Sequence, residues 1–236
     1  MFKAILEVVK FVEPDEIVHI GDLMDYPQPS RWTKGTREEF EGNIYSASEA
    51  AKKAILEPLR AVFDGPIGVH EGNHDMRPRL YLEKYAPALS QTDMLNFENL
   101  LDFDGFGITR LPDFYNVAAG WITTHGHLGG IRLNQNAGMT ALNGAKRIGK
   151  NIIMGHTHRA GVSSFTQGIE GQTNTITGVE VGHILNPKAV TYLRGASGNW
   201  QQGFALLEID KNNVTPRILP VLGNKVIVDG VVFPTR

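Results

Sequence analysis

The stretch "PIGVHEGNHDMR", residues 66–77, joins a short apolar run to a dense group of polar side chains. The apolar part is typical of a buried strand, and Gly72 marks a turn after it. Asn73, His74 and Asp75 then place an amide, an imidazole and a carboxylate at consecutive positions. A single cluster of this kind is more often a turn than a site, so its meaning depends on the rest of the chain.

Three further polar clusters follow strand-like runs in the same way: "GDLMD" at 21–25, "THGH" at 124–127 and "GHTH" at 155–158. Ligands of open α/β sheets bind at the carboxyl ends of the strands. Four such ends would bring a common set of side chains to one rim, namely Asp22, Asn73, His125, His156 and His158. Five of the eight histidines lie in three of these clusters, which argues against a chance arrangement.

The chemistry of these side chains indicates a metal site. Carboxylate, amide and imidazole ligands suit borderline divalent metals such as Mn, Fe, Ni or Zn. The chain has no cysteine, so disulfides and thiolate zinc sites are excluded. One aspartate can bridge two ions, and two ions about 3.5–4 Å apart form the clamp used for displacement at phosphorus.

As a set, the four motifs resemble those of the calcineurin-like metallophosphoesterase family, and its bacterial and phage-borne members most. The segment "SGNWQQGFALLEID", residues 197–210, also resembles one that follows the last metal motif in some members. The resemblance implies an α/β fold in which a two-layer β-sandwich is flanked by helices, a four-layer α/β/β/α arrangement, formed by one domain over residues 1–236. It further implies hydrolysis of a phosphomonoester or phosphodiester by a metal-activated hydroxide.

The resemblance also implies a role for each metal-ligating residue. Asp22 would bridge two ions. Asn73, His125 and His156 would complete one metal site, and His158 would belong to the other.

Two neighbouring residues take catalytic roles under the same resemblance. His74 would stabilise the phosphoryl transition state or protonate the leaving oxygen, and Asp75 would orient its imidazole. The "NHD" sequence would thus supply a metal ligand, a catalytic imidazole and its orienting carboxylate.

Three more polar residues near the motifs have competing interpretations. Arg77 is a candidate contact for a substrate phosphate, or a surface arginine paired with Glu71 or Glu83. His127 is a candidate substrate contact or a solvated loop residue. Asp25 is a candidate hydrogen-bond partner for a metal-ligating histidine, or an aspartate of the turn before "YPQP".

One family motif is missing, the Asp-x-His that supplies two ligands to the metal of His158. The helix expected at 2–12 also lacks the leading strand of a normal crossover, which suggests that roughly 10–20 residues are lost, misassigned or supplied by something else. Three interpretations follow. The chain is truncated; or it binds one metal and has weak or altered activity; or it is a degenerate, non-catalytic metal-binding or interaction module.

The periodicity of apolar residues predicts the other elements. Helices are expected at 2–12, ended by Pro14, from a Thr36–Glu39 capping box to Leu59, and at 77–87 and 137–149. Residues 88–116 show no clean period and suggest an insertion or lid whose aromatic residues either cover the core or form a partner surface. Residues 160–236 predict antiparallel strands, among them "TNTITGVEV", "AVTYL", "FALLEI" and "NKVIVDGVVF".

Composition limits the partners and location. The net charge of −2 gives the protein no overall positive field that would attract nucleic acid. Binding to long nucleic acid is therefore less expected but not excluded. No signal peptide or membrane-spanning run is evident, so a cytoplasmic protein acting on a phosphate ester, without membrane contact, is expected. An open strand edge near the amino terminus would favour pairing with another chain.

Overall fold

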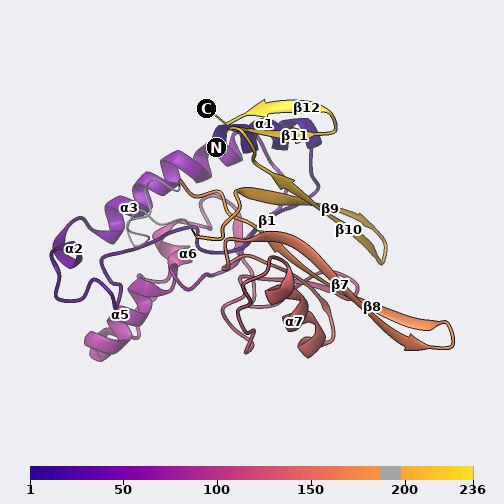
Figure 1. Cartoon of the computed structure of the whole chain (residues 1–236). Helices are drawn as coiled ribbons and strands as arrows, with labels where there is room; N and C mark the ends of the chain where they lie inside the picture. The colour runs from indigo at the N-terminus through magenta and orange to yellow at the C-terminus, as the bar shows by residue number, and fades with distance from the viewer. Residues whose placement is uncertain (187–197, 236) are drawn as a thin grey trace. The chain divides into compact units, whose positions relative to one another are not determined.

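The computed structural model describes residues 1–186 and 198–235, which form a mixed α/β structure with several sheets (Figure 1). The chain divides into two compact units. Unit 1 comprises Met1–Val8 and Asp113–Arg236, and unit 2 comprises Val9–Pro112. Helix α1 (Phe2–Val12) contributes residues to both and ends before Pro14, as predicted. The run "AVTYL", residues 189–193, lies outside the described residues.

Unit 2 contains a parallel sheet with the strand order β1-β2-β3. The strands are β1 (Ile17–His19), β2 (Ile67–Val69) and β3 (Ile108–Arg110). Strand β2 is central and all three of its residues are buried, whereas β1 lies at one end of the order. The helical segments of this unit are α2 (Arg37–Phe40), α3 (Ile44–Ala51), the π-helical η1 (Lys52–Leu56), α4 (Glu57–Arg60), α5 (Arg77–Tyr85), the 3₁₀ turn η2 (Pro87–Leu89) and α6 (Phe97–Leu100).

The helix expected from Thr36 to Leu59 is interrupted, and the predicted capping box is wrong. The Thr36 hydroxyl donates to the carbonyl of Thr33, while Glu39 accepts from the amide of Gly35. A new helix begins after Asn43, whose side chain accepts from the amide of Ser46 at 2.8 Å. An asparagine at the N-cap satisfies a backbone donor that the first helical turn leaves without a partner, so a cap forms here instead.

Two aromatic residues of segment 88–116 belong to the core. Phe97 and Phe103 are buried and pack edge to face with ring centroids 5.0 Å apart. Leu101 beside them is also fully buried. The core-covering alternative is therefore confirmed for these two phenylalanines, and the segment also supplies strand β3.

Unit 1 is built on a five-stranded mixed sheet with the order β4-β5-β6-β8-β7. The strands are β4 (Tyr115–Ala118), β5 (Trp121–Thr124), β6 (Asn151–Met154), β7 (Ala160–Ile169) and β8 (Gln172–Val181). Strands β5, β6 and β8 are parallel, whereas β4 and β7 are antiparallel to their neighbours. The β7–β8 hairpin is long and its turn extends beyond the other strands of the sheet (Figure 1).

The two faces of this sheet bury different partners. Alternate residues of β6 point to opposite faces, as strand geometry requires. Ile152 and Met154 pack with Ala141 and Ala145 of α7 (Met139–Ile148) on one face. On the other face, Ile153 joins a cluster with residues of β9 (Gly203–Asp210) and β10 (Asn213–Pro220). Unit 1 thus has a helix, a sheet and a β-hairpin as successive layers.

The three hairpins of the carboxyl-terminal part are antiparallel, as predicted, whereas the pairing of β8 with β6 is parallel and was not predicted. Strand β7 pairs with β8, β9 with β10, and β11 (Lys225–Val228) with β12 (Val231–Pro234). Among residues 1–186 and 198–235, no helix is long and apolar enough to cross a membrane.

Helix α7 is fixed to β8 by two residues of that strand. A Cβ on Gly178 would overlap the backbone of Leu142, so only glycine permits this close approach. The fully buried carboxylate of Glu180 accepts hydrogen bonds from the amides of Gly138, Thr140 and Ala141 at 3.1, 3.0 and 3.4 Å. A carboxylate at this position satisfies amides that the helix itself cannot pair and complements the helix dipole.

Replacing this buried acceptor should destabilise the fold. Glu180→Gln leaves one side-chain oxygen to serve three amides, which should lower the free energy of unfolding by about 1–3 kcal/mol. Denaturant unfolding measures the change, with exposed Glu170→Gln in the β7–β8 turn as the matched control. Equal stability of the two variants would contradict the capping role of Glu180.

Candidate metal site and catalytic histidine

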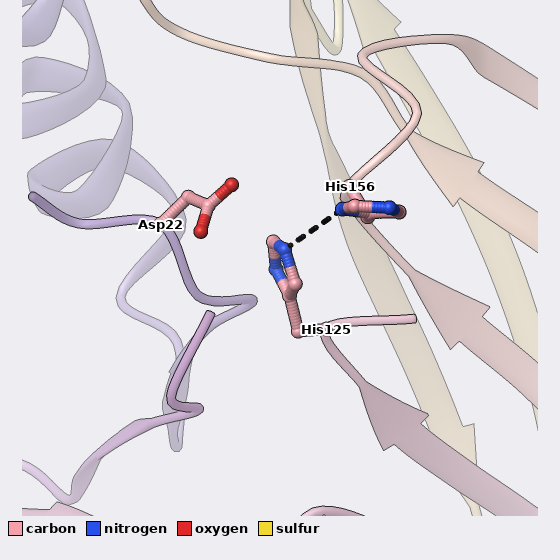
Figure 2. Close-up of side chains that lie close together, drawn as sticks. All are labelled: Asp22, His125 and His156. Carbon is pink, nitrogen blue, oxygen red and sulfur yellow. Dashed lines mark hydrogen bonds between the residues drawn. The ribbon is translucent and has the colours of Figure 1, made fainter. Parts of the chain in front are cut away.

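Two adjacent parallel strands position the imidazoles of His125 and His156 in unit 1. The register pairs Thr124, the last residue of β5, with Met154, the last residue of β6. His125 follows β5 directly and His156 follows β6 after Gly155, so both emerge at the same edge of the sheet. His125 Nε2 and His156 Nδ1 lie 3.2 Å apart (Figure 2). The sequence prediction that these strand ends meet is confirmed for this pair.

The spacing of the two ring nitrogens fits a shared metal ion. Two imidazoles bound to one ion at metal–nitrogen distances of about 2.0–2.1 Å, with bond angles near 90–110°, hold their nitrogens about 2.9–3.4 Å apart. The 3.2 Å separation, at which the two rings form a hydrogen bond in the structure, falls within this interval. His125 is buried, with 2% of its surface exposed, and this burial restricts its ring to few orientations.

The backbone at these strand ends is conformationally costly. His156 and His158 have φ values of +62° and +59°, in the left-handed region that L-residues with a Cβ rarely occupy. Each such residue costs about 1–2 kcal/mol. Strain of this kind is often found at functional sites, although turn residues such as Glu170 and Asp229 have the same left-handed conformation in this chain.

His127 joins the same group of rings. Its centroid lies 5.2 Å from that of His125 and 6.2 Å from that of His156. The structure therefore brings His127 to the predicted metal ligands within unit 1, and it is half-buried rather than a fully solvated loop residue.

A further histidine, His183, was not identified from the sequence. It follows β8, the third parallel strand, and its ring centroid lies 5.5 Å from that of His158. Trp200 packs edge to face against His158 at 4.5 Å. Burial, together with the nearby His158, lowers the pKa of His183 to about 4. The signal was available in "GVEVGH", another strand followed by Gly-His, but the antiparallel pairing expected there obscured the parallel end of β8.

In unit 2, Asp22 lies directly against the turn that follows β2. Strands β1 and β2 are parallel, and the amide of His70 continues their pairing by donating to His19. A Cβ on Gly72 would overlap both the carboxylate and the backbone of Asp22. Asp22 Oδ1 accepts from the amide of His74 at 2.9 Å. Half-buried Asn73 lies between these two contact points, so the structure brings Asp22 to the "GNHD" turn as predicted.

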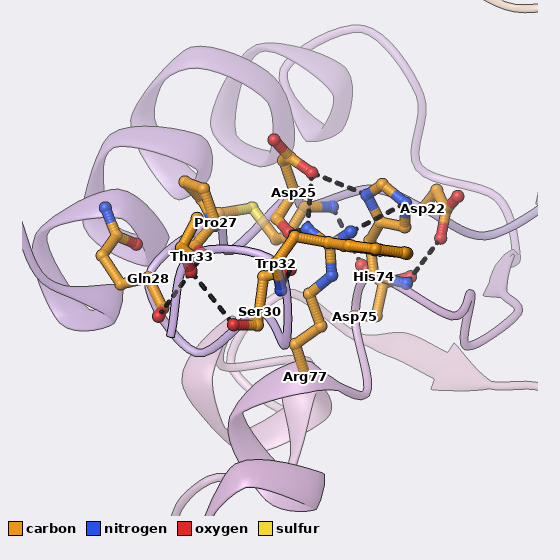
Figure 3. Close-up of polar contacts among 11 residues, drawn as sticks. Asp22, Asp25, Pro27, Gln28, Ser30, Trp32, Thr33, His74, Asp75 and Arg77 are labelled. Atoms are coloured by element: carbon orange, nitrogen blue, oxygen red, sulfur yellow. Dashed lines mark hydrogen bonds and ion pairs between the residues drawn. The ribbon is translucent and has the colours of Figure 1, made fainter. Parts of the chain in front are cut away.

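The prediction that Asp75 orients the His74 ring is wrong, because the carboxylate that contacts this ring belongs to Asp25. Asp25 Oδ1 lies 2.6 Å from His74 Nδ1 (Figure 3). Asp75 is fully buried and accepts from the amides of Met24 and Gly72 at 2.9 and 2.8 Å. Its carboxylate thereby joins the 21–25 and 72–75 turns, whereas a side chain one position after His74 points away from that ring.

Arg77 fixes the tautomer of His74. Its Nη2 lies 3.1 Å from His74 Nε2, and a guanidinium has only donors, so Nε2 accepts this hydrogen bond. The ring proton is therefore on Nδ1, which donates to Asp25. Arg77 Nη1 also donates to the carboxylate and carbonyl oxygens of Asp25 at 2.8 and 2.6 Å (Figure 3). The hydrogen bond from His74, followed by the charge of Arg77, lowers the pKa of Asp25 against the effect of its partial burial.

Glu71 and Glu83, the alternative partners predicted for Arg77, form ion pairs with Arg79 instead, at 3.3 and 3.2 Å. Arg77 instead pairs with Asp25, so the surface-arginine interpretation is wrong in its choice of partners. Asp25 in turn contacts His74, which is a predicted catalytic histidine and not a predicted metal ligand.

Comparison with known proteins identifies close relatives. The chain is 55% identical over 232 residues to the Gene 54 protein of Mycobacterium phage D29 and 53% identical over 232 residues to the Gene 54 protein of Mycobacterium phage L5. Each match covers 98% of this chain and 91% of the relative. No protein-family model matches the chain. The chain belongs to the family of these mycobacteriophage Gene 54 proteins, whose names state no activity.

Adding a methyl group at Gly72 should displace Asp22. Gly72→Ala should lower the free energy of unfolding by about 1–3 kcal/mol and shift the amide resonance of His74, because that amide donates to Asp22. Nuclear magnetic resonance and denaturant unfolding measure the two effects. Gly35→Ala is the control, since its φ of +76° imposes strain while its Cβ meets no atom within 4 Å. An unchanged His74 amide in Gly72→Ala would contradict the contact.

The tautomer of His74 can be measured directly. Long-range ¹H–¹⁵N spectra at about pH 8, where imidazoles are neutral, should show a proton on Nδ1 and none on Nε2. Removing both contacts, in Asp25→Ala with Arg77→Met, should move the population toward the Nε2–H form. Arg79→Met is the control on the same helix. A wild-type His74 protonated on Nε2 would overturn the assignment.

Proposed function

We propose that this protein is a metal-dependent phosphoesterase that hydrolyses a phosphomonoester or phosphodiester. Its proposed ligands are Asp22, Asn73, His125 and His156 for one divalent ion, with His158 and bridging Asp22 for another. The four motifs at strand ends support this ligand set. The observation that carries the proposal is the pair of ring nitrogens 3.2 Å apart on His125 and His156.

The proposal includes a finer description of the fold, the four-layer α/β/β/α sandwich of the calcineurin-like metallophosphoesterases. Unit 1 supports it with helix α7, the mixed sheet and the β9–β10 hairpin as successive layers. The parallel sheet of unit 2, with polar residues after β1 and β2, is consistent with the remaining part.

The metal ion would be Mn, Fe, Ni or Zn, which match the mixture of imidazole, carboxylate and amide ligands. When bound, such an ion polarises a phosphoryl oxygen and lowers the pKa of water. The protein's contribution is to fix the ligands in advance. In unit 2, packing against Gly72 positions Asp22. In unit 1, burial positions His125.

His74 is the proposed proton donor to the leaving oxygen. Its Nδ1 proton is held by Asp25, so a proton to be transferred has to occupy Nε2. The carboxylate of Asp25 would hold the Nδ1 proton and orient the ring, so that Nε2 faces the leaving oxygen to which it gives its proton. Asp75 supports the same geometry by joining the two turns that carry Asp22 and His74.

Arg77 is the proposed contact for the substrate phosphate. A guanidinium matches phosphate oxygens in geometry and charge. In the structure its Nη2 occupies the hydrogen-bonding position at His74 Nε2. When Arg77 turns to a phosphate, it releases Nε2, so substrate binding and exposure of the catalytic nitrogen are coupled.

Hydrolysis assays with variants test the proposal. The purified protein loaded with Mn²⁺ should hydrolyse bis(p-nitrophenyl) phosphate or p-nitrophenyl phosphate, and a chelator should abolish this activity. His74→Asn should lower kcat by about 10²–10⁴-fold without loss of metal, because it removes only the proton donor. His125→Ala should lose metal as well. Glu170→Gln, remote in the β7–β8 turn, is the control and should match the wild type.

Two results would contradict the proposal in different ways. A wild-type protein that takes up no divalent ion after loading is neither an enzyme of this type nor a metal-binding module. A protein that binds metal through His125 but hydrolyses neither substrate is the non-catalytic module considered as the alternative.

A further inference from the structure

We propose that His183, together with His158, binds a second divalent cation in unit 1, with borderline metals such as Zn²⁺, Ni²⁺ or Co²⁺ preferred. The inference rests on the proposed function to the extent that His158 is a metal ligand there. It adds a ligand, His183, that lies in none of the four motifs and was not identified from the sequence.

The topology of unit 1 brings His183 to the same sheet edge as the other strand-end histidines. Strands β5, β6 and β8 are adjacent and parallel, and the register pairs Met154 of β6 with Glu180 of β8. Their carboxyl ends therefore lie at one edge of the sheet. His125 follows the first strand, His156 and His158 follow the second, and His183 follows the third.

A single residue fixes the backbones of His158 and His183 relative to each other. The amide of Gln201 donates to the carbonyl of His158 at 2.9 Å, and its carbonyl accepts from the amide of His183 at 3.2 Å. A Cβ on Gly182 would crowd this Gln201 carbonyl at 2.7 Å, so glycine permits the approach. The amide of Gly182 also donates to Arg159 at 2.7 Å. The backbones of both histidines are thus joined through Gln201 without any ligand.

The side chains within this frame suit a cation. The ring centroids of His158 and His183 are 5.5 Å apart, close to the 5.0 Å of the His125–His156 pair whose nitrogens fit one ion. Within residues 1–186 and 198–235, the buried Nδ1 of His183 has no hydrogen-bond partner. A buried polar atom without a partner costs free energy, and a bound cation would recover it.

Trp200 defines the wall of this site. Its ring lies 4.5 Å from His158 and 6.1 Å from His183. The indole packs against both imidazoles and offers no metal-ligating atom. An ion held by two imidazoles would keep open coordination positions for water or a phosphate oxygen, whereas a structural site is closed by four protein ligands.

Metal titration of three variants separates this inference from the proposed function. His183→Phe keeps a ring against Trp200 but removes both nitrogens, and Ile184→Ala changes the exposed next residue as a control. Calorimetric titration with Zn²⁺ should give about two ions per chain for the wild type and for Ile184→Ala, and about one for His183→Phe. His125→Ala should lose the other ion and keep the one at His183.

Each outcome bears on one claim. Unchanged Zn²⁺ uptake in His183→Phe overturns the inference, whatever His125→Ala does. Unchanged uptake in His125→Ala overturns the ligand set of the proposed function and leaves His183 to be judged on its own variant. Should His183→Phe fail to fold, nuclear magnetic resonance of the wild-type protein tests the inference. On addition of Zn²⁺, the ring ¹⁵N resonances of His183 should shift, and unmoved resonances overturn the proposal.

Discussion

The parallel pairing of short strands is the constraint on which the rest of this structure depends. In unit 1, β5, β6 and β8 run in the same direction, so the residues that follow them emerge at one edge. In unit 2, the same relation between β1 and β2 brings Asp22 against Gly72. A shift of one residue would reverse the faces of each strand, so the buried clusters on both sides of β6 hold the histidines in place as well.

Much of the fold could be predicted because hydrophobic periodicity is a local signal. Helices α1 and α7, the strands β1, β2, β5 and β6, and the antiparallel carboxyl-terminal region all follow from it. The failures arose where short polar interactions compete. Thr36 and Glu39 have the spacing of a capping box, yet both bond to the preceding loop, and Asn43 forms the cap that starts the next helix. Spacing alone does not reveal which of several nearby backbone groups a side chain will bond to.

The candidate site shows the same division between pattern and geometry. The sequence indicated that His125 and His156 meet and that Asp22 approaches the "GNHD" turn. The prediction that Asp75 orients the imidazole of His74 was wrong, because adjacency in sequence suggests contact while the turn directs the two side chains apart and Asp25 takes this place. His183 was missed for a topological reason. The parallel pairing of β8 with β6 is a long-range property, and the strong antiparallel pairing of β8 with β7 concealed it.

The left-handed backbone at Asp22, His156 and His158 has a consequence for how this protein can change. Glycine or asparagine at these positions would relieve strain and make the fold more stable, yet would remove a carboxylate or an imidazole. At these positions a more stable backbone and a polar side chain at the strand end are therefore alternatives, and selection for thermal stability alone would favour the loss of the side chain.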